Sequence, residues 1–175
     1  MASIPGAVAV GWCGDVSIRL HFQAGWCDLT FQSGTSSYVG RTTFIIDGFT
    51  DFVDSVADLA EGRRSTAVVW GKEPGGVFID TSRTFANVLC IVVAELRNDD
   101  WLAPSNWLPE RGSTLWTATV SRDDFLLATY RALMNLTVIS STAVEGWQWP
   151  FPAIAFHRLQ AAVEESINVP AANTT

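Results

Sequence analysis

The sequence has little lysine and no cluster of basic residues, and this shortage bears on its partners. Lys72 is the only lysine among 175 residues, and Arg63 and Arg64 form the only adjacent basic pair. Nucleic-acid binding requires Lys and Arg side chains that neutralise phosphates. With a net charge of −7, the sequence argues against a nucleic-acid partner. The acidic charge suits a basic protein partner, although it also serves solubility alone.

Cysteine is scarce, and no long hydrophobic run stands near the N-terminus. Cys13, Cys27 and Cys90 are an odd number at wide spacings without a CxxC motif, and each lies among apolar neighbours. They are typical of free thiols that pack as small hydrophobes in a reducing compartment. The apolar stretch at residues 7–10 is too short for a signal core or a membrane span. We therefore expect a cytoplasmic protein without a membrane partner.

Histidine is also rare, which limits acid–base and nucleophilic catalysis. His21 falls on the polar side of an expected strand, where the hairpin register places it near Asp28, and a His–Asp contact there is a possible general base. The alternative is an exposed strand histidine. His157 falls on the surface or boundary of an expected helix, and neither histidine has a nucleophile motif nearby. The sequence predicts no catalytic residues and favours a protein that is not an enzyme.

The acidic residues do not follow a metal-binding pattern. Asp51, Asp54 and Asp58 have the spacing of a solvated helix face, and residues 98–100 (Asn-Asp-Asp) lack the alternate ligands of a calcium loop. The spacing of His and Cys fits no zinc site. Residues 75–76 (Gly-Gly) precede a strand rather than a helix, so they are typical of a turn and not of a phosphate site. We expect no metal and no cofactor.

A substantial core is available to the chain. Apolar residues make up 48% and charged residues 17% of the sequence, and a chain of this length suffices for one domain. We predict a single domain over residues 1–175, with frayed ends at residues 1–6 and 168–175.

Periodic patterns predict mostly strands, with one helix in the first half of the chain and two helices near its C-terminal end. Val16 to Gln23 alternates apolar and polar residues, and 26–32 repeats the pattern after a tight turn, so the two form a hairpin. Further strands are expected at 7–12, 38–46, 65–70, 77–81, 87–96 and 113–120. Helices are expected at 48–61, 122–139 and 152–167, the first with Asp47 as N-cap.

This order predicts an α+β fold. We expect a two-layer sandwich in which three helices pack on one face of a largely antiparallel sheet of about seven strands. The stretch Asn87 to Leu96 has apolar residues on both alternating sets, which is typical of a central strand covered on both faces.

Aromatic residues are plentiful, with eight Trp and ten Phe, and several occur in two loops at 97–112 and 145–151. Because Trp is enriched at binding hot spots, we expect the loops to form an acidic, aromatic recognition surface. The alternative is that these rings cap the core. The candidate binding residues are Asp99, Asp100, Trp101, Trp107, Glu110, Trp147 and Trp149.

The sheet face away from the helices is a second candidate contact surface. Its expected side chains are polar and mixed in charge, which suits either solvent or a protein contact. They are Arg19, His21, Trp26, Asp28, Thr30, Arg41, Thr43, Asp80 and Thr117.

These features favour a non-enzymatic protein that binds another protein. In element order and size the chain resembles small bacterial accessory proteins, including some toxin-neutralising immunity proteins, and this resemblance of architecture implies a protein partner. Two alternatives remain open. One is a small-molecule binding module or enzyme, with a carbohydrate or apolar ligand under the Trp-rich loops. The other is a homo-oligomeric structural subunit.

Overall fold

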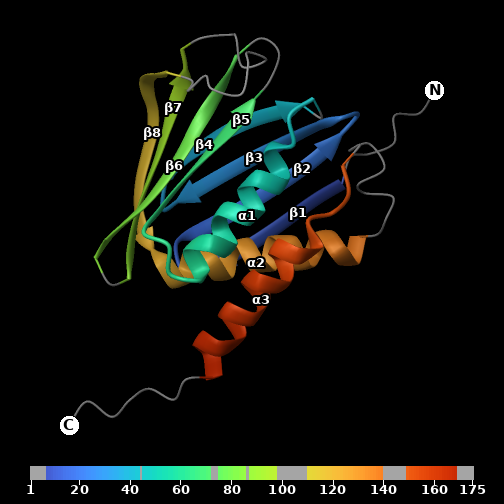
Figure 1. Ribbon diagram of the computed structural model, residues 1–175, viewed down its shortest axis with the longest axis vertical. Helices are drawn as coiled ribbons and strands as arrows, with labels where there is room; N and C mark the ends of the chain where they lie inside the picture. Colours follow the sequence, from blue (N-terminus) through green and yellow to red (C-terminus); the bar gives the residue numbers. More distant parts are fainter. Residues whose placement is uncertain are drawn as a thin grey trace.

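The structure, a computed structural model, describes residues 7–43, 45–71, 75–85, 87–97, 110–139 and 149–168. These residues form eight strands and three helices, and the strands make two antiparallel sheets (Figure 1). Sheet A contains β1 (Ala7–Cys13), β2 (Val16–Gln23), β3 (Trp26–Ser33) and β4 (Ser36–Thr43) in that order. Sheet B contains β5 (Ser65–Gly71), β6 (Gly76–Phe85), β7 (Val88–Leu96) and β8 (Arg111–Ser121) in that order. The helices are α1 (Gly48–Ala60), α2 (Arg122–Ile139) and α3 (Ala153–Asn168).

The α+β class, the antiparallel pairing and the three helices are confirmed, but the prediction of one sheet of about seven strands is wrong. The described strands divide into two sheets of four. The chain leaves β4 through α1 rather than a tight turn, and β5 then begins a new sheet. Strands β4 and β5 do not pair with each other. A side-chain hydrogen bond joins them instead, from Thr42 Oγ1 to the Gly71 carbonyl at 2.6 Å. Alternation reveals which face a strand buries, but not which strand lies beside it.

Sheet A follows the predicted alternation. In β2 the even-numbered residues Val16 to Phe22 are buried, and Arg19 and Gln23 are exposed on the other side. β3 pairs with β2 through the turn at Ala24 and Gly25, whose φ angles are 50° and 83°. Positive φ at both central residues matches the twist of a two-residue hairpin.

The first helix begins and ends where its sequence indicates. The Asp47 side chain accepts a hydrogen bond from the Thr50 amide at 3.1 Å, so it caps the N-terminus as predicted. Gly62 follows the helix with a φ of 100°, in the left-handed region that glycine adopts without strain. These contacts fix the two ends of α1, and its apolar stripe faces the core.

Helix α2 covers β1, the outer strand of sheet A. Gly11 permits this contact, because a Cβ at that position would overlap the Ala128 carbonyl and the Ala132 amide of the helix. Two α2 side chains then donate to β1 carbonyls, Asn135 to Val10 at 2.7 Å and Arg131 to Trp12. The edge of β1 is thus closed by side chains rather than by another strand.

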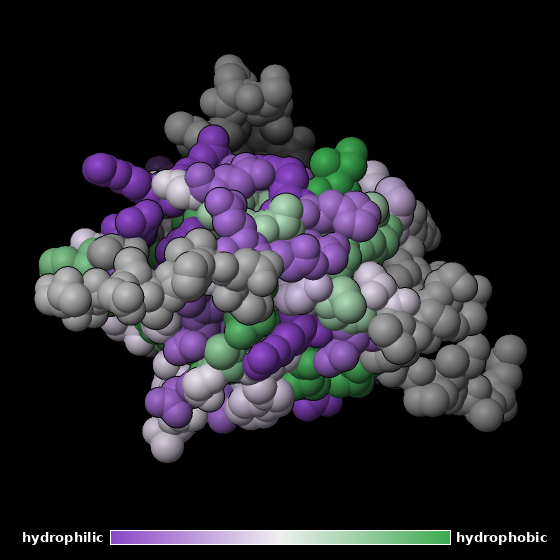
Figure 2. All heavy atoms as spheres, turned by 90° about the horizontal axis from the view of Figure 1, so that it is seen from below, coloured by the Kyte–Doolittle hydropathy of each residue, from purple (hydrophilic) through white to green (hydrophobic). Residues whose placement is uncertain are grey.

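Helix α3 is joined to α1 by an ion-pair cluster. Arg158 contacts Asp54 at 3.3 Å, Asp58 at 2.6 Å and Glu61 at 2.6 Å. The expected solvated acidic face of α1 therefore binds an arginine. Seen from below Figure 1, the described surface is largely hydrophilic, with small hydrophobic patches between (Figure 2). None of the helices in the described part of the chain combines the length and the apolarity needed to cross a membrane.

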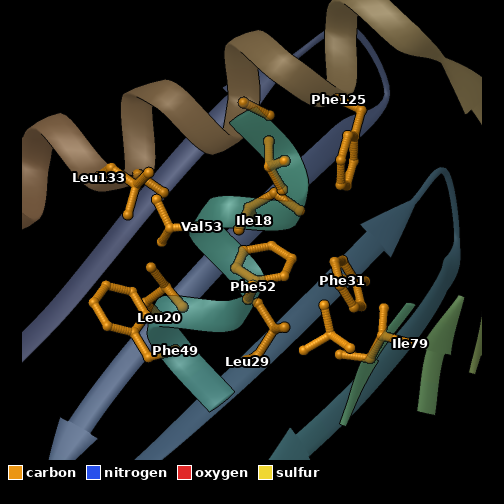
Figure 3. Packing of buried hydrophobic residues seen from close by; sticks show 14 of the residues in the cluster. Ile18, Leu20, Leu29, Phe31, Phe49, Phe52, Val53, Ile79, Phe125 and Leu133 are labelled. Carbon is orange, nitrogen blue, oxygen red and sulfur yellow. The ribbon is translucent and has the colours of Figure 1, made fainter. Parts of the chain in front are cut away.

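The core lies between sheet A, α1 and α2, and it extends to sheet B. Figure 3 shows Phe52 of α1 among Ile18, Leu29 and Phe31 of sheet A. The Phe52 ring also meets Trp70 of β5 edge to face, with ring centroids 6.1 Å apart. Since α1 touches both sheets, burial of its aromatic side chains fixes their relative position.

Strand β7 occupies an interior place in sheet B, between β6 and β8. Leu89, Ile91 and Val93 are buried on the core side, and Ala94 and Leu96 are buried on the other. The predicted central strand is therefore confirmed as an interior strand, but its second face is buried only at Ala94 and Leu96, and Val88, Cys90 and Val92 are half-buried.

Candidate functional site

One face of sheet A is turned away from the helices, and we call it the open face. The inward residues of β2 and β3 belong to the core cluster that α1 and α2 share, so the alternate residues point outward. The open face is formed by Arg19, His21, Trp26, Asp28, Thr30, Val39 and Arg41. Strand pairing aligns His21, Asp28 and Arg41 in one row across three strands, and Arg19, Thr30 and Val39 in the next.

An ion-pair network orders the first of these rows. The Arg41 guanidinium donates to both Asp28 oxygens, from Nε at 2.5 Å and from Nη2 at 2.8 Å. It also lies over the Trp26 ring, 5.6 Å from the ring centroid. These hydrogen bonds hold the pKa of the Asp28 carboxyl below its ordinary value, with smaller contributions from the charges of Arg41 and His21. The row is thus ordered by contacts within the protein itself.

The predicted His–Asp contact is present in this network. His21 Nδ1 lies 3.5 Å from Asp28 Oδ2. Both Asp28 oxygens already accept from Arg41, so the carboxylate is shared rather than devoted to orienting the imidazole. His157, the other histidine, lies 3.4 Å from Gln160 on exposed α3. Asp28 therefore contacts Arg41 and His21 together.

A groove borders the open face where β4 passes over sheet B, and we call it the β4 groove. One wall consists of residues 38–41 of β4, and Gly76 and Asp28 also contribute to the lining. The other wall takes residues from all four strands of sheet B, namely Trp70, Val77 (beside Gly76 of the same strand), Glu95 and Leu115. The groove has a volume of about 410 Å³, within the range of sites that hold a small ligand or a short peptide.

Two side chains that line this groove carry hydrogen-bond donors. The indole of Trp70 is fully buried, and its Nε1–H has no hydrogen-bond partner among the described residues. A Cβ at Gly40 would lie 3.3 Å from Trp70 Cδ1, the ring carbon next to Nε1, and 3.3 Å from the Tyr38 hydroxyl, so both side chains border that glycine. Burial raises the pKa of Tyr38, and its hydroxyl therefore keeps its proton.

The residues predicted from the Trp-rich loops fall partly within the described residues. Asp99, Asp100, Trp101, Trp107 and Trp147 lie outside the described residues. Glu110 is exposed just before β8, and its carbonyl accepts from the Arg97 amide at 2.9 Å. Trp149 is 41% exposed ahead of α3. Figure 1 places β8 at the left margin and the first turns of α3 right of centre. A common surface for all seven residues stays a prediction.

The second predicted surface is divided by the two-sheet architecture. Six of its nine residues share the outward side of sheet A, but Thr43 is buried at the end of β4, and Asp80 and Thr117 belong to sheet B. There Asp80 accepts two hydrogen bonds from Arg111, at 2.6 and 2.7 Å. The expectation of one continuous polar face is therefore wrong for Asp80 and Thr117.

The three cysteines are free thiols, and two lie in settings that keep them protonated. Burial raises the pKa of Cys27. Burial also raises the pKa of Cys13, whose thiol donates to Asp124 Oδ1 at 3.1 Å. A raised pKa lowers the thiolate fraction and with it nucleophilicity. Within the described residues, His, Cys, Asp and Glu side chains form no group of three that could hold a metal ion.

Sequence reasoning missed the β4 groove altogether. Tyr38, Trp70 and Glu95 come from different strands and two sheets, and their approach depends on how the sheets pack. Comparison of the chain with protein-family models, curated proteins and solved structures gives no match to any of them. The case for function consequently depends on the geometry of the open face and the groove.

Proposed function

We propose that the protein is a non-enzymatic binding protein that contacts another protein through the open face of sheet A. The observation that carries the proposal is the ordered group of Arg41, Asp28 and Trp26 on a sheet face that the helices leave uncovered. Trp and Arg are the residue types most enriched at binding hot spots.

The rigidity of this face supports binding. Its side chains stand on four hydrogen-bonded strands, and Arg41 is held by a carboxylate and an aromatic ring at once. Association costs free energy for every side chain that becomes ordered, so a group ordered beforehand lowers that cost. Val39, 61% exposed in the adjacent row, adds apolar area that a partner would bury.

The charge of the chain indicates the kind of partner. The net charge of −7 attracts a basic protein over distances of about 10 Å at moderate salt. On the open face, Arg19 is exposed and has no ion-pair partner among the described residues, so it is available to donate to carbonyl oxygens of the partner. We therefore propose a basic protein that is attracted by the net charge of the whole chain. Its carbonyl or carboxylate oxygens contact Arg19, the excess positive charge beside the Asp28–Arg41 pair on the open face.

Site-specific photo-crosslinking tests this assignment. A benzophenone amino acid at Thr30, in the middle of the open face, should crosslink a basic protein in a native lysate of the source. The same group at Thr137, exposed on α2, should give no such product. Equal crosslinking from both positions, or from neither, would contradict the proposal.

Quantitative binding of the captured partner gives a second measurement. Trp26→Ala should weaken it by about 30-fold, the size of a hot-spot loss of roughly 2 kcal/mol. Thr137→Ala serves as the matched control and should leave the affinity unchanged. An unaltered affinity in Trp26→Ala would remove the open face from the interface.

A further inference from the structure

Strand β4 ends sheet A and leaves one of its edges without a strand partner. It pairs with β3 on one side, and no described strand hydrogen-bonds to the other. The strand is fixed to sheet B at both ends, through Trp116 Nε1 to Ser36 Oγ at 2.7 Å and through Thr42 Oγ1 to the Gly71 carbonyl. Between these two anchors, residues 38–41 line the β4 groove. Half of the backbone groups of an outer strand point away from its neighbour and are free to pair.

The opposite wall has the dimensions of a short extended peptide. Trp70, Val77, Glu95 and Leu115 come from the four successive strands of sheet B. Four strands at a spacing of about 4.8 Å span roughly 14 Å. An extended chain advances about 3.3 Å per residue, so roughly four residues fill that length. The same number of β4 residues, 38–41, lies along the groove.

The groove offers an occupant a hydrogen-bond donor and a negative charge. The protonated Tyr38 hydroxyl can donate to a carbonyl oxygen, and the Trp70 indole, whose buried Nε1–H has no partner among the described residues, lines the same groove. Its charged lining residues are Asp28, Arg41 and Glu95, and the first two neutralise each other through the paired hydrogen bonds. Glu95 is exposed without an ion-pair partner among the described residues. The excess negative charge therefore selects a basic side chain.

We propose that the β4 groove binds an extended segment of about four residues that adds to the free edge of β4, with a Lys or Arg side chain beside Glu95. The segment belongs to the basic partner of the open face, so the inference rests on the proposed function. Addition of a strand to an exposed edge is a recurrent mode of peptide recognition, in which main-chain hydrogen bonds supply affinity and flanking side chains supply specificity.

Titration with the capped peptide acetyl-Lys-Val-Lys-Val-amide, followed by NMR, tests the groove directly. The Trp70 indole N–H resonance, assigned by its loss in Trp70→Phe, should move in a saturable manner as the peptide binds. Amide exchange should slow at those of residues 39–41 whose N–H groups point away from β3, because the free edge becomes paired. The same peptide with every backbone amide N-methylated keeps its charge but cannot donate, and it should produce neither effect.

Two variants test the charge. Glu95→Gln should weaken peptide binding by about two- to fivefold, as expected for an exposed ion pair. Glu164→Gln, an exposed α3 position, is the charge-matched control and should bind like the wild type. Equal binding by Glu95→Gln and wild type would overturn the assignment of a basic side chain.

Three other results would overturn strand addition. They are an unmoved Trp70 resonance, equal binding of the N-methylated peptide, and a Trp70 shift that follows protein concentration without peptide. The last would indicate a second copy of the chain as the occupant. Failure here is separable from failure of the proposed function, because Trp26 and Thr30 lie on the open face and outside the groove lining.

Discussion

At the scale of single residues, the Asp28 carboxyl on the open face also contributes to the stability of the folded protein. Arg41 hydrogen bonds lower its pKa in the folded protein. The resulting stabilisation is fully present above the unfolded pKa of about 3.9 and is lost as the pH falls through the lower folded pKa. At pH near 7, Asp28→Asn should therefore reduce the free energy of unfolding by about 0.5–1 kcal/mol, since the pair is partly exposed and screened.

Urea unfolding of both proteins across acidic pH measures this effect. The difference between wild type and Asp28→Asn should shrink as the pH falls below about 4. Asp15→Asn, an exposed turn position without an arginine partner among the described residues, is the control and should be nearly neutral at pH near 7. A difference between wild type and Asp28→Asn that persists to pH about 2 would contradict the role of the Arg41 hydrogen bonds.

At the scale of elements, the contact between β1 and α2 depends on Gly11. An alanine there would push its Cβ into the helix backbone, which cannot yield as a flexible side chain would. We expect Gly11→Ala to lower the free energy of unfolding by about 3 kcal/mol, the upper range for overpacking. Urea denaturation monitored by far-UV circular dichroism gives the value.

Gly34→Ala provides the comparison for this substitution. Gly34 has a φ of 56° and open space around its Cβ position, so alanine there meets only backbone strain of roughly 1–2 kcal/mol. A loss in Gly11→Ala no larger than that in Gly34→Ala would show that α2 does not press on β1 as described.

The elements themselves were largely predictable from local patterns. The alternation at Val16 to Gln23 gives a strand and its buried side, and the hairpin register places His21 against Asp28. Residues 122–139 form a helix with the predicted bounds, and Ser121 Oγ accepts from the Asp124 amide at 3.3 Å, as the capping pattern indicates. Such signals are contained within a few neighbouring residues.

Contacts between elements were not predictable in the same way. The alternation of residues in β4 and β5 does not indicate whether these two strands pair. They do not pair, and for that reason the described strands form two sheets. Tyr38 and Glu95 meet in the groove through packing of these sheets. For the open face, the outward residues of sheet A were predicted, whereas Asp80 and Thr117 were assigned to it on the assumption of one sheet.

At the scale of the whole molecule, the described residues form two successive units of four strands and a helix, and α3 follows the second unit. The helices do not simply cover their own strands. α2, which follows sheet B, packs on β1 and β2 of sheet A, and α1 packs against β5. Each unit therefore supplies part of the core of the other, and we expect neither to fold alone.

Fragment complementation tests this interdependence. Residues 1–62 and 63–175, made separately, should each lack native near-UV circular dichroism, because their aromatic core is incomplete. Mixing them should restore the signal, and the complex should unfold cooperatively. Cooperative unfolding of residues 1–62 without the second fragment would show that sheet A and α1 are sufficient for a stable core.

The closure of β1 by α2 also sets an order of events during synthesis. Val10 and its hydrogen-bond partner Asn135 are 125 residues apart in the chain. At a translation rate of about 5–20 residues per second, β1 leaves the ribosome roughly 6–25 s before its cover is made. During that interval the nascent chain carries an unpaired strand edge, which is the kind of segment that chaperones bind. The fold is thus completed late, and its first strand is protected last.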